Sequence, residues 1–313
     1  EVSADIFTAD LIHALKKERP DIAIMGMGGA RMRQAGADIT VDLTAHSTVG
    51  LIEIVEHIPA IFHAYRTLIA MMKREKPDLV LLVDFQGFNM LIARAAKKMG
   101  LKVVYFIPPQ EWLWGTEKGV QAVIDNVDTI ISIFKEEAEA YQNRGRRVIY
   151  FGHPLVDRFA TRMPKNEARR RLSLPASASP VISLFPGSRK QEVQRHLPIL
   201  LETAALLAAD YPNALFLLSC VTPRYTQDCQ RALAAPALAK RLSNRVRLIE
   251  GQSDFLLQSA DLALLSSGTI TLEAALTQTP MVVIYRFSRL TEWIARKILH
   301  IDIMYKSNKI LLV

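Results

Sequence analysis

Short apolar runs rich in β-branched residues recur along the chain, and amphipathic helical patterns separate most of them. This alternation is typical of parallel sheets that are covered by helices on both faces. The runs of the first half are residues 22–27, 79–83, 103–107, 129–134 and 148–151, and those of the second half are 181–185, 215–219, 246–249, 262–265 and 281–285. So many strands favour two doubly wound α/β domains over one.

The chain has 313 residues, which is enough for two domains of about 150 residues each. We expect the boundary within residues 157–179, because that stretch is rich in Arg, Pro and Ser. The predicted domains are 1–157 and 158–313. Residues 6–18 have a helical pattern, whereas a doubly wound domain usually opens with a strand. Residues 1–5 are therefore expected to be a strand-to-helix loop, with the first strand upstream of this chain.

Composition excludes several classes of protein. Half of the residues are apolar and 22% are charged, so the chain is neither disordered nor of low complexity. Its two cysteines, Cys220 and Cys229, exclude a disulfide scaffold and favour a reducing compartment. The sequence has neither an uncharged apolar run of transmembrane length nor a secretory signal.

The positive charge lies in the second half of the chain. Residues 1–155 carry a net charge of −1 and residues 156–313 a net charge of +9. A basic half indicates an anionic partner, such as a nucleotide or a lipid headgroup. Nucleic acid is not expected, since the longest run of adjacent arginines is the short one at 169–171.

Residues 185–192 (Phe-Pro-Gly-Ser-Arg-Lys-Gln-Glu) lie between an apolar run and a helical pattern. A turn at Gly187 and Ser188 would leave backbone N–H groups free at the positive end of a helix. Arg189 can form a bidentate contact with a phosphate. The segment therefore indicates a diphosphate-binding loop, and an ordinary turn with a surface arginine is the alternative.

Residues 265–273 also connect an apolar run to a helix. Ser267, Gly268 and Thr269 place small donors at the helix start, and Glu273 could accept hydrogen bonds from ribose hydroxyls. Ligands of open α/β sheets bind at the carboxyl ends of strands, where both this loop and the one at 185–192 are predicted. The alternative is a helix cap with a surface carboxylate.

Residues 25–31 imitate a dinucleotide fingerprint, but the third glycine position is Arg31. No dinucleotide site is expected there, and Gly28-Gly29 is interpreted as a turn with positive φ. Residues 49–72 carry apolar side chains at helical spacing, which indicates a helix that is buried or touches lipid. Pro59 predicts a break or kink inside that helix.

Polar or aromatic residues follow three further apolar runs. Asp84 follows 79–83 and is either a catalytic carboxylate or a loop residue, with Asn89 expected to cap the next helix. The loop that contains Trp112 is expected either to line a sugar or acyl pocket or to pack within the protein. His153 is expected either to contact a ligand at an interdomain cleft or to have a structural role. The sequence has no zinc-type spacing, Walker loop or Gly-x-Ser-x-Gly motif.

Together these segments resemble the lipid-A-disaccharide synthase family of GT-B glycosyltransferases. The resemblance spans essentially the whole chain. It is carried by Ser3 and Asp5, residues 49–54, Asp84 with Phe88-Asn89, residues 152–154 with Asp157, residues 186–189 with Glu192, residues 267–269 with Glu273, and Asn308.

The resemblance implies two Rossmann-like domains facing a cleft and an inverting reaction. UDP-2,3-diacylglucosamine would donate its sugar to 2,3-diacylglucosamine 1-phosphate, giving a β-1′,6-linked disaccharide and UDP. Asp84 is the candidate base, and neither a metal nor a cofactor is expected. The other site residues fall into three sets. Donor residues are Gly187, Ser188, Arg189, Glu192, Ser267, Gly268, Thr269 and Glu273; acceptor or cleft residues are Ser3, Asp5, Asn89, Trp112, His153 and Asn308; lipid-facing residues are Ile52, Val55, Ile58, Ile61, Phe62 and Ile69.

The same resemblance implies a peripheral enzyme on the cytoplasmic face of the bacterial inner membrane. It also implies a homodimer through a C-terminal segment beyond Val313. Two other interpretations remain open. One is another UDP-sugar transferase or epimerase of the same fold, and the other is a non-catalytic module that binds a nucleotide or a lipid.

Overall fold

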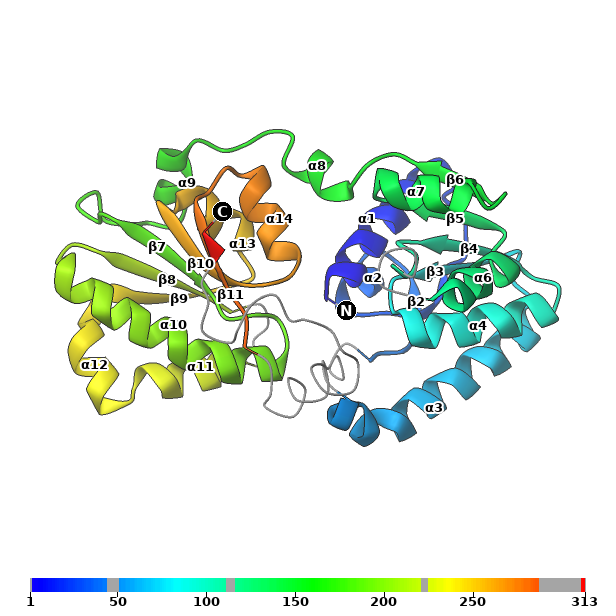
Figure 1. Ribbon diagram of the computed structural model, residues 1–313, viewed down its shortest axis with the longest axis horizontal. Coiled ribbons are helices and arrows are strands. Elements are labelled where there is room, and N and C mark those ends of the chain that lie inside the picture. The colour runs from blue at the N-terminus through cyan, green and yellow to red at the C-terminus, as the bar shows by residue number, and fades with distance from the viewer. Residues whose placement is uncertain (1, 44–50, 111–115, 221–224, 287–310, 313) are drawn as a thin grey trace. The chain divides into compact units, whose positions relative to one another are not determined.

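The computed structural model describes residues 2–43, 51–110, 116–220, 225–286 and 311–312, with side chains for 3–43, 58–110, 116–220 and 225–286. The described chain divides into two compact units between Pro154 and Leu155. In Figure 1 the elements from α1 to β6 belong to the first unit, and those from α9 to β12 belong to the second.

The first unit contains a four-stranded parallel sheet in the order β3-β4-β5-β6, and a separate parallel pair, β1 and β2. The strands are β1 (Met25–Met27), β2 (Asp38–Val41), β3 (Leu79–Val83), β4 (Lys102–Phe106), β5 (Thr129–Ser132) and β6 (Arg147–Tyr150). The helices are α1 (Val2–Glu18), α2 (Ala30–Gln34), α3 (Leu51–Glu75), α4 (Gln86–Lys98), α6 (Glu117–Asn126) and α7 (Lys135–Gln142).

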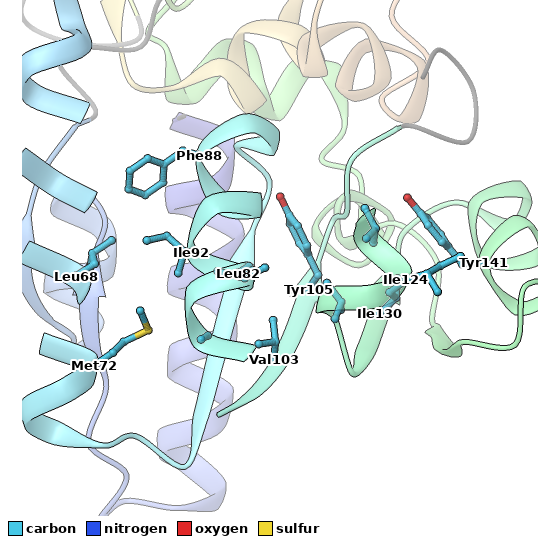
Figure 2. Close-up of a cluster of buried hydrophobic side chains, with 14 of the residues drawn as sticks. Leu68, Met72, Leu82, Phe88, Ile92, Val103, Tyr105, Ile124, Ile130 and Tyr141 are labelled. Atoms are coloured by element: carbon cyan, nitrogen blue, oxygen red, sulfur yellow. The ribbon is translucent and has the colours of Figure 1, made fainter. Parts of the chain in front are cut away.

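Helices α3, α4 and α6 share one buried cluster with strands β3, β4 and β5. Leu68 from α3 and Ile92 from α4 point into this cluster beside Leu82 of β3 (Figure 2). Two fully buried tyrosines, Tyr105 and Tyr141, lie in the same cluster. Their hydroxyls point to the same side in Figure 2 and donate hydrogen bonds to backbone carbonyls.

The second unit contains a six-stranded sheet in the order β12-β11-β10-β7-β8-β9, in which only β12 is antiparallel to its neighbour. The strands are β7 (Val181–Phe185), β8 (Leu215–Cys220), β9 (Val246–Glu250), β10 (Leu262–Ser266), β11 (Met281–Ile284) and β12 (Leu311–Leu312). The helices are α8 (Pro154–Arg158), α9 (Lys165–Arg171), α10 (Lys190–Asp210), α11 (Thr226–Leu233), α12 (Pro236–Leu242), α13 (Ser253–Ser259) and α14 (Thr269–Leu276), with a short 3₁₀ turn at Ser243–Arg245.

Both faces of the second sheet are buried, as a solid apolar strand requires. Ile182 and Leu184 of β7 face the cluster formed with α10, α11 and α12, while Val181 and Phe185 face the cluster formed with α13 and α14. Figure 1 shows these two sets of helices on opposite faces of the sheet. The predicted α/β class with parallel sheets is therefore confirmed.

Several local expectations were wrong. Helix α1 begins at Val2, so residues 2–5 form its first turn rather than a loop. Strand β2 was not predicted, and Pro59 lies inside α3 without the break that was one of its two expected effects. In the glycine-rich turn the positive φ occurs at Gly26 and not at Gly28 or Gly29.

Candidate functional site

Two predicted donor loops leave the same edge of the second sheet. Strands β7 and β10 are hydrogen-bonded neighbours, with Leu265 opposite Phe185. The loops after them, 186–188 and 267–268, therefore start about 4.8 Å apart. Each leads directly into the N-terminus of a helix, α10 or α14. Two positive helix ends beside each other form a favourable site for a diphosphate.

The loop before α10 is held by the carboxylate of Glu192. Its Oε2 accepts hydrogen bonds from the backbone N–H groups of Ser188 (3.0 Å) and Arg189 (3.3 Å), and its Oε1 accepts one from Arg189 Nη1 (2.9 Å). The prediction that the turn at Gly187 and Ser188 leaves its backbone N–H groups free was therefore wrong for Ser188, because the Glu192 side chain folds back onto it. Glu192 organises this loop, and its negative charge makes it a poor direct contact for phosphate.

Gly187 is required by the same arrangement. Its φ is +120°, and a Cβ at this position would lie 2.5 Å from both Cβ and Oε2 of Glu192. Only glycine accommodates that backbone conformation together with the overlying carboxylate. The Arg189 side chain remains partly exposed beside the loop, where its guanidinium can reach a ligand.

In the second loop, Gly268 is the N-cap of α14 and uses no side-chain cap. Ser267 is exposed and Thr269 is the first helical residue. The Gly268 carbonyl accepts bonds from the backbone N–H and the hydroxyl of Thr271. The Thr269 hydroxyl is thus not the cap of its own helix.

Glu273 lies one turn further along α14, in a partly buried position. Burial, followed by the negative charge of Asp254, raises the pKa of its carboxyl to about 7. Ser253 Oγ lies 3.5 Å from Glu273 Oε2, and Arg158 is already held by a bidentate contact with Asp254. Glu273 is therefore suited to accept further hydrogen bonds from a ligand.

In the first unit, Asp84 follows β3 and has a left-handed backbone with φ +48°; Phe85 is also left-handed, with φ +44°. Such conformations cost energy in non-glycine residues and persist only where neighbours hold them. Here the Asp84 carbonyl accepts hydrogen bonds from Asn89 Nδ2 (2.7 Å) and the Tyr105 hydroxyl (2.7 Å). These contacts fix the backbone from which the Asp84 carboxylate projects.

Asn89 does not cap α4 as predicted, because the N-cap is Phe85. Its buried amide donates to the carbonyls of Val83 and Asp84 and so closes the turn before the helix. Tyr105 was missed. The available signal was a tyrosine near the end of a buried strand, whose hydroxyl needs a partner; burial raises the pKa of that hydroxyl above its usual value.

Asp5 acts on the backbone of the glycine-rich turn. Its Oδ1 accepts hydrogen bonds from the N–H groups of Gly29 (2.9 Å) and Met32 (3.1 Å), and its Oδ2 accepts one from Arg31 (3.1 Å). The N–H groups at the start of α2 thus already have the chain's own carboxylate as their acceptor. Ser3 lies nearby in the first turn of α1 and is partly buried.

We expect Asp5→Ala to lower the free energy of unfolding by about 2 kcal/mol, because the amides around the start of α2 lose a charged acceptor. Asp5→Asn should lose less, since its amide oxygen still accepts. Urea unfolding followed by circular dichroism measures both. Asp10→Ala, at an exposed position of the same helix, is the control; equal losses in Asp5→Ala and Asp10→Ala would contradict the capping role.

His153 follows β6, which is at the opposite edge of the first sheet from β3. Its ring packs edge-on against Phe7 and Phe134, with both centroid distances 5.8 Å. Burial lowers the pKa of the imidazole. Since β3 and β6 are the two outer strands of this sheet, three strand spacings, about 14 Å, separate the strand ends before Asp84 and His153. His153 is therefore not part of the same cluster as Asp84.

The predicted lipid-facing residues of helix α3 differ in their exposure to solvent. Ile58 and Phe62 are exposed, with 52% and 59% of their surface accessible. Ile61 and Ile69 are partly buried against the core of the first unit rather than directed outward, because they share the core-facing side of α3. Four of the predicted site residues lie outside the part of the chain whose side chains are described: Ile52, Val55, Trp112 and Asn308.

Among the residues that the structure describes, no group of three or more His, Cys, Asp or Glu side chains is arranged to hold a metal ion. In the same part of the chain, no helix has the length and apolar character needed to cross a membrane.

Two parallel α/β units with polar loops at the carboxyl ends of their strands define a protein of the GT-B type. The family model described as lipid-A-disaccharide synthetase matches residues 1–312. The chain belongs to this family, whose members are glycosyltransferases of lipid A biosynthesis.

Relatives with the name lipid-A-disaccharide synthase support this assignment. One from Coxiella burnetii is 33% identical over 98% of this chain and 79% of the relative. One from Geobacter metallireducens is 36% identical over 96% and 77%. A third, lipid-A-disaccharide synthase 1 from Legionella pneumophila, is 38% identical over 93% and 74%.

Solved structures confirm the fold at much lower identity. The Staphylococcus aureus MnaA–UDP structure has a TM-score of 0.60 and 15% identity, covering 91% of this chain and 77% of that one. The UDP-GlcNAc 2-epimerase of Neisseria meningitidis, bound to UDP-GlcNAc, has a TM-score of 0.59 and 17% identity, covering 92% and 81%.

Proposed function

We propose that this protein transfers 2,3-diacylglucosamine from UDP to 2,3-diacylglucosamine 1-phosphate, with inversion at the anomeric carbon. The products are the β-1′,6-linked disaccharide 1-phosphate and UDP. The observation that carries the proposal is the pair of adjacent strand-end loops at 186–188 and 267–268, each leading into a helix N-terminus, in a chain of this family.

The donor nucleotide would occupy this edge of the second sheet. The N-terminus of α14, which has no side-chain cap, and the Arg189 guanidinium favour the diphosphate and stabilise the charge that develops on UDP as the sugar–oxygen bond breaks. Gly187 and Ser188 shape the first loop, while Ser267, Gly268 and Thr269 shape the second. Glu273 accepts hydrogen bonds from the ribose hydroxyls.

Asp84 would remove the proton from the acceptor hydroxyl as its oxygen attacks the anomeric carbon. The bond from that carbon to the UDP oxygen breaks as the new bond forms, which gives inversion. Asn89 and Tyr105 keep the Asp84 backbone in place during this step. Ser3, Trp112, His153 and Asn308 remain proposals for the acceptor side.

The test is transfer by the full-length protein in detergent micelles, with both acylated substrates and without added metal. Formation of UDP and disaccharide in equal amounts is expected. UDP binding without disaccharide, across several acyl lengths, would refute the acceptor assignment. Faster turnover of unacylated UDP-N-acetylglucosamine would favour the epimerase or non-lipid transferase alternative.

The raised pKa of Glu273 predicts that nucleotide binding depends on pH. A group with a pKa of about 7 is mostly protonated at pH 6 and mostly ionised at pH 8. Ribose hydroxyls bond best to the ionised carboxylate, so binding releases a proton and affinity for UDP rises about tenfold over this range. Calorimetry measures the affinity, and Glu273→Gln corrects for ionisation of UDP itself. An identical pH dependence in wild type and variant would exclude this role.

We also propose that the protein forms a homodimer, and light scattering tests its oligomeric state. A further proposal is that the protein binds the cytoplasmic face of the inner membrane through α3. Ile58 and Phe62 are exposed one helical turn apart, and the Arg66 guanidinium lies 5.9 Å from the Phe62 ring centre. An apolar pair beside a cation suits an anionic bilayer surface.

Replacing both Ile58 and Phe62 with Ser should weaken binding to vesicles that contain anionic lipid by about tenfold, because the buried apolar area is lost. Vesicle co-sedimentation measures this effect. The control is Leu206→Ser, which changes an apolar side chain of similar exposure in α10. Equal binding by the double variant and wild type would remove α3 as the docking element.

A further inference from the structure

His196 makes two hydrogen bonds that together fix its protonation state. It lies in the second turn of α10 and is 1% exposed. Nδ1 is 3.0 Å from the Pro186 carbonyl oxygen, and Nε2 is 3.1 Å from the Arg286 backbone nitrogen. A carbonyl only accepts and a backbone N–H only donates, so Nδ1 carries the proton and Nε2 accepts. The ring is therefore neutral.

These two bonds join the first residue of one donor loop to the chain after β11. Pro186 follows β7, while Arg286 lies just after β11. Strand β10 lies between β7 and β11 in the sheet, so the loop at 267–268 starts between the two segments that His196 connects. The Tyr285 ring packs on the imidazole at 5.3 Å.

One face of α10 supplies both a hydrogen-bond acceptor and a hydrogen-bond donor to the loop at 186–189. Glu192 and His196 are four residues apart and share one face of α10. Glu192 accepts from the N–H groups of Ser188 and Arg189, and His196 donates to the carbonyl of Pro186. The backbone on both sides of Gly187 is thus held from one side.

The surroundings favour the neutral ring. Burial lowers the pKa of His196, and Arg195 adds to that effect; the contact with the Pro186 carbonyl and the charge of Glu192 oppose it. Among the described residues after β11, Tyr285 packs its ring on the imidazole and Arg286 contacts it through the backbone N–H.

We propose that His196 is a positioning residue of the donor site. Its neutral imidazole holds the Pro186 carbonyl through Nδ1 and thereby sets where Arg189 meets the diphosphate, while the bond from the Arg286 N–H keeps the proton on Nδ1. This inference rests on the proposed function, because the ligand is the nucleotide of that same site.

Two substitutions separate the two bonds. In His196→Asn the amide nitrogen can take the place of Nδ1, which keeps the bond to Pro186 and loses the one to Arg286. In His196→Gln the longer amide can reach the place of Nε2, which keeps the bond to Arg286 and loses the one to Pro186. His196→Ala loses both, and His13→Gln, at an exposed position of α1, is the control.

Calorimetric titration of the full-length protein with UDP, together with thermal unfolding, tests the proposal. His196→Ala and His196→Gln should bind UDP roughly ten- to a hundredfold more weakly, because a buried carbonyl loses its donor and releases the loop. His196→Asn should stay within about threefold of wild type. In the transfer assay the KM for the donor should rise while kcat changes little. Nitrogen NMR of the wild type should show the proton on Nδ1.

The outcomes distinguish this inference from the proposed function. If the wild type binds UDP and every variant binds it equally well, His196 does not position the site, whatever happens to thermal stability. A proton on Nε2, or a charged ring at pH 7, would also overturn the proposal. If the wild type binds no UDP, the proposed function fails and the inference fails with it.

Discussion

Asp84→Asn is expected to lower kcat by about 10²–10⁴-fold, which is the usual contribution of a general base. The amide has the same shape as the carboxylate but cannot take the proton of the acceptor hydroxyl. The bonds from Asn89 and Tyr105 are made to the Asp84 backbone carbonyl, so they survive the substitution. The loss should therefore appear in turnover, with donor KM and thermal stability close to wild type.

Asp78→Asn is the matched control. Asp78 is exposed and precedes β3, so it lies at the opposite end of the strand that Asp84 follows. Its substitution should leave kcat unchanged. Turnover within a factor of five in Asp84→Asn would show that Asp84 is not the base.

The second large effect is expected for Arg189→Ala, which should lower kcat/KM for the donor by about 10²–10³-fold. A cation that meets the leaving diphosphate stabilises the transition state more than the ground state, and losing one such group has this size of effect. The substitution also removes the partner of the buried Glu192 carboxylate. Some loss of UDP affinity should therefore accompany the loss of turnover.

Arg170→Ala controls for the removal of an arginine. Arg170 forms an ion pair with Glu167 at the same three-residue spacing as Arg189 with Glu192, but it is 78% exposed. Steady-state kinetics and UDP titration compare the two variants. If Arg189→Ala behaves like Arg170→Ala, the diphosphate is held elsewhere.

The strands of the second unit were predictable because both of their faces are buried. Strand β7 is buried at every position and apolar at all of them except Ser183, whose hydroxyl donates to the Leu256 carbonyl, and that pattern is visible in the sequence. Strand β2 was missed because it is short and alternates polar with apolar residues, with exposed Asp38 and Thr40. Its pairing with β1 depends on the tertiary fold more than on local preference.

The position of the candidate site was also predictable, since it follows from where strands end. The partners of each side chain were not. Asn89 and Glu192 both fold back onto the chain that precedes their helices, and residue type alone does not distinguish this from a cap or a ligand contact. Tyr105 and His196 are buried, and only the packed structure shows which carbonyls and N–H groups they meet.

The order of strands in the second sheet also bears on how such an enzyme can change during evolution. The loops after β7 and β10 start side by side, although β8 and β9 separate these two strands in the chain. Each of the two loops, 186–188 and 267–268, is a short segment that can acquire substitutions independently, while the hydrogen-bonded strands keep both starting points in place. A new sugar or acyl preference can then arise one loop at a time, without a change in the buried core. This modularity is consistent with solved structures that share the fold at 15–17% identity.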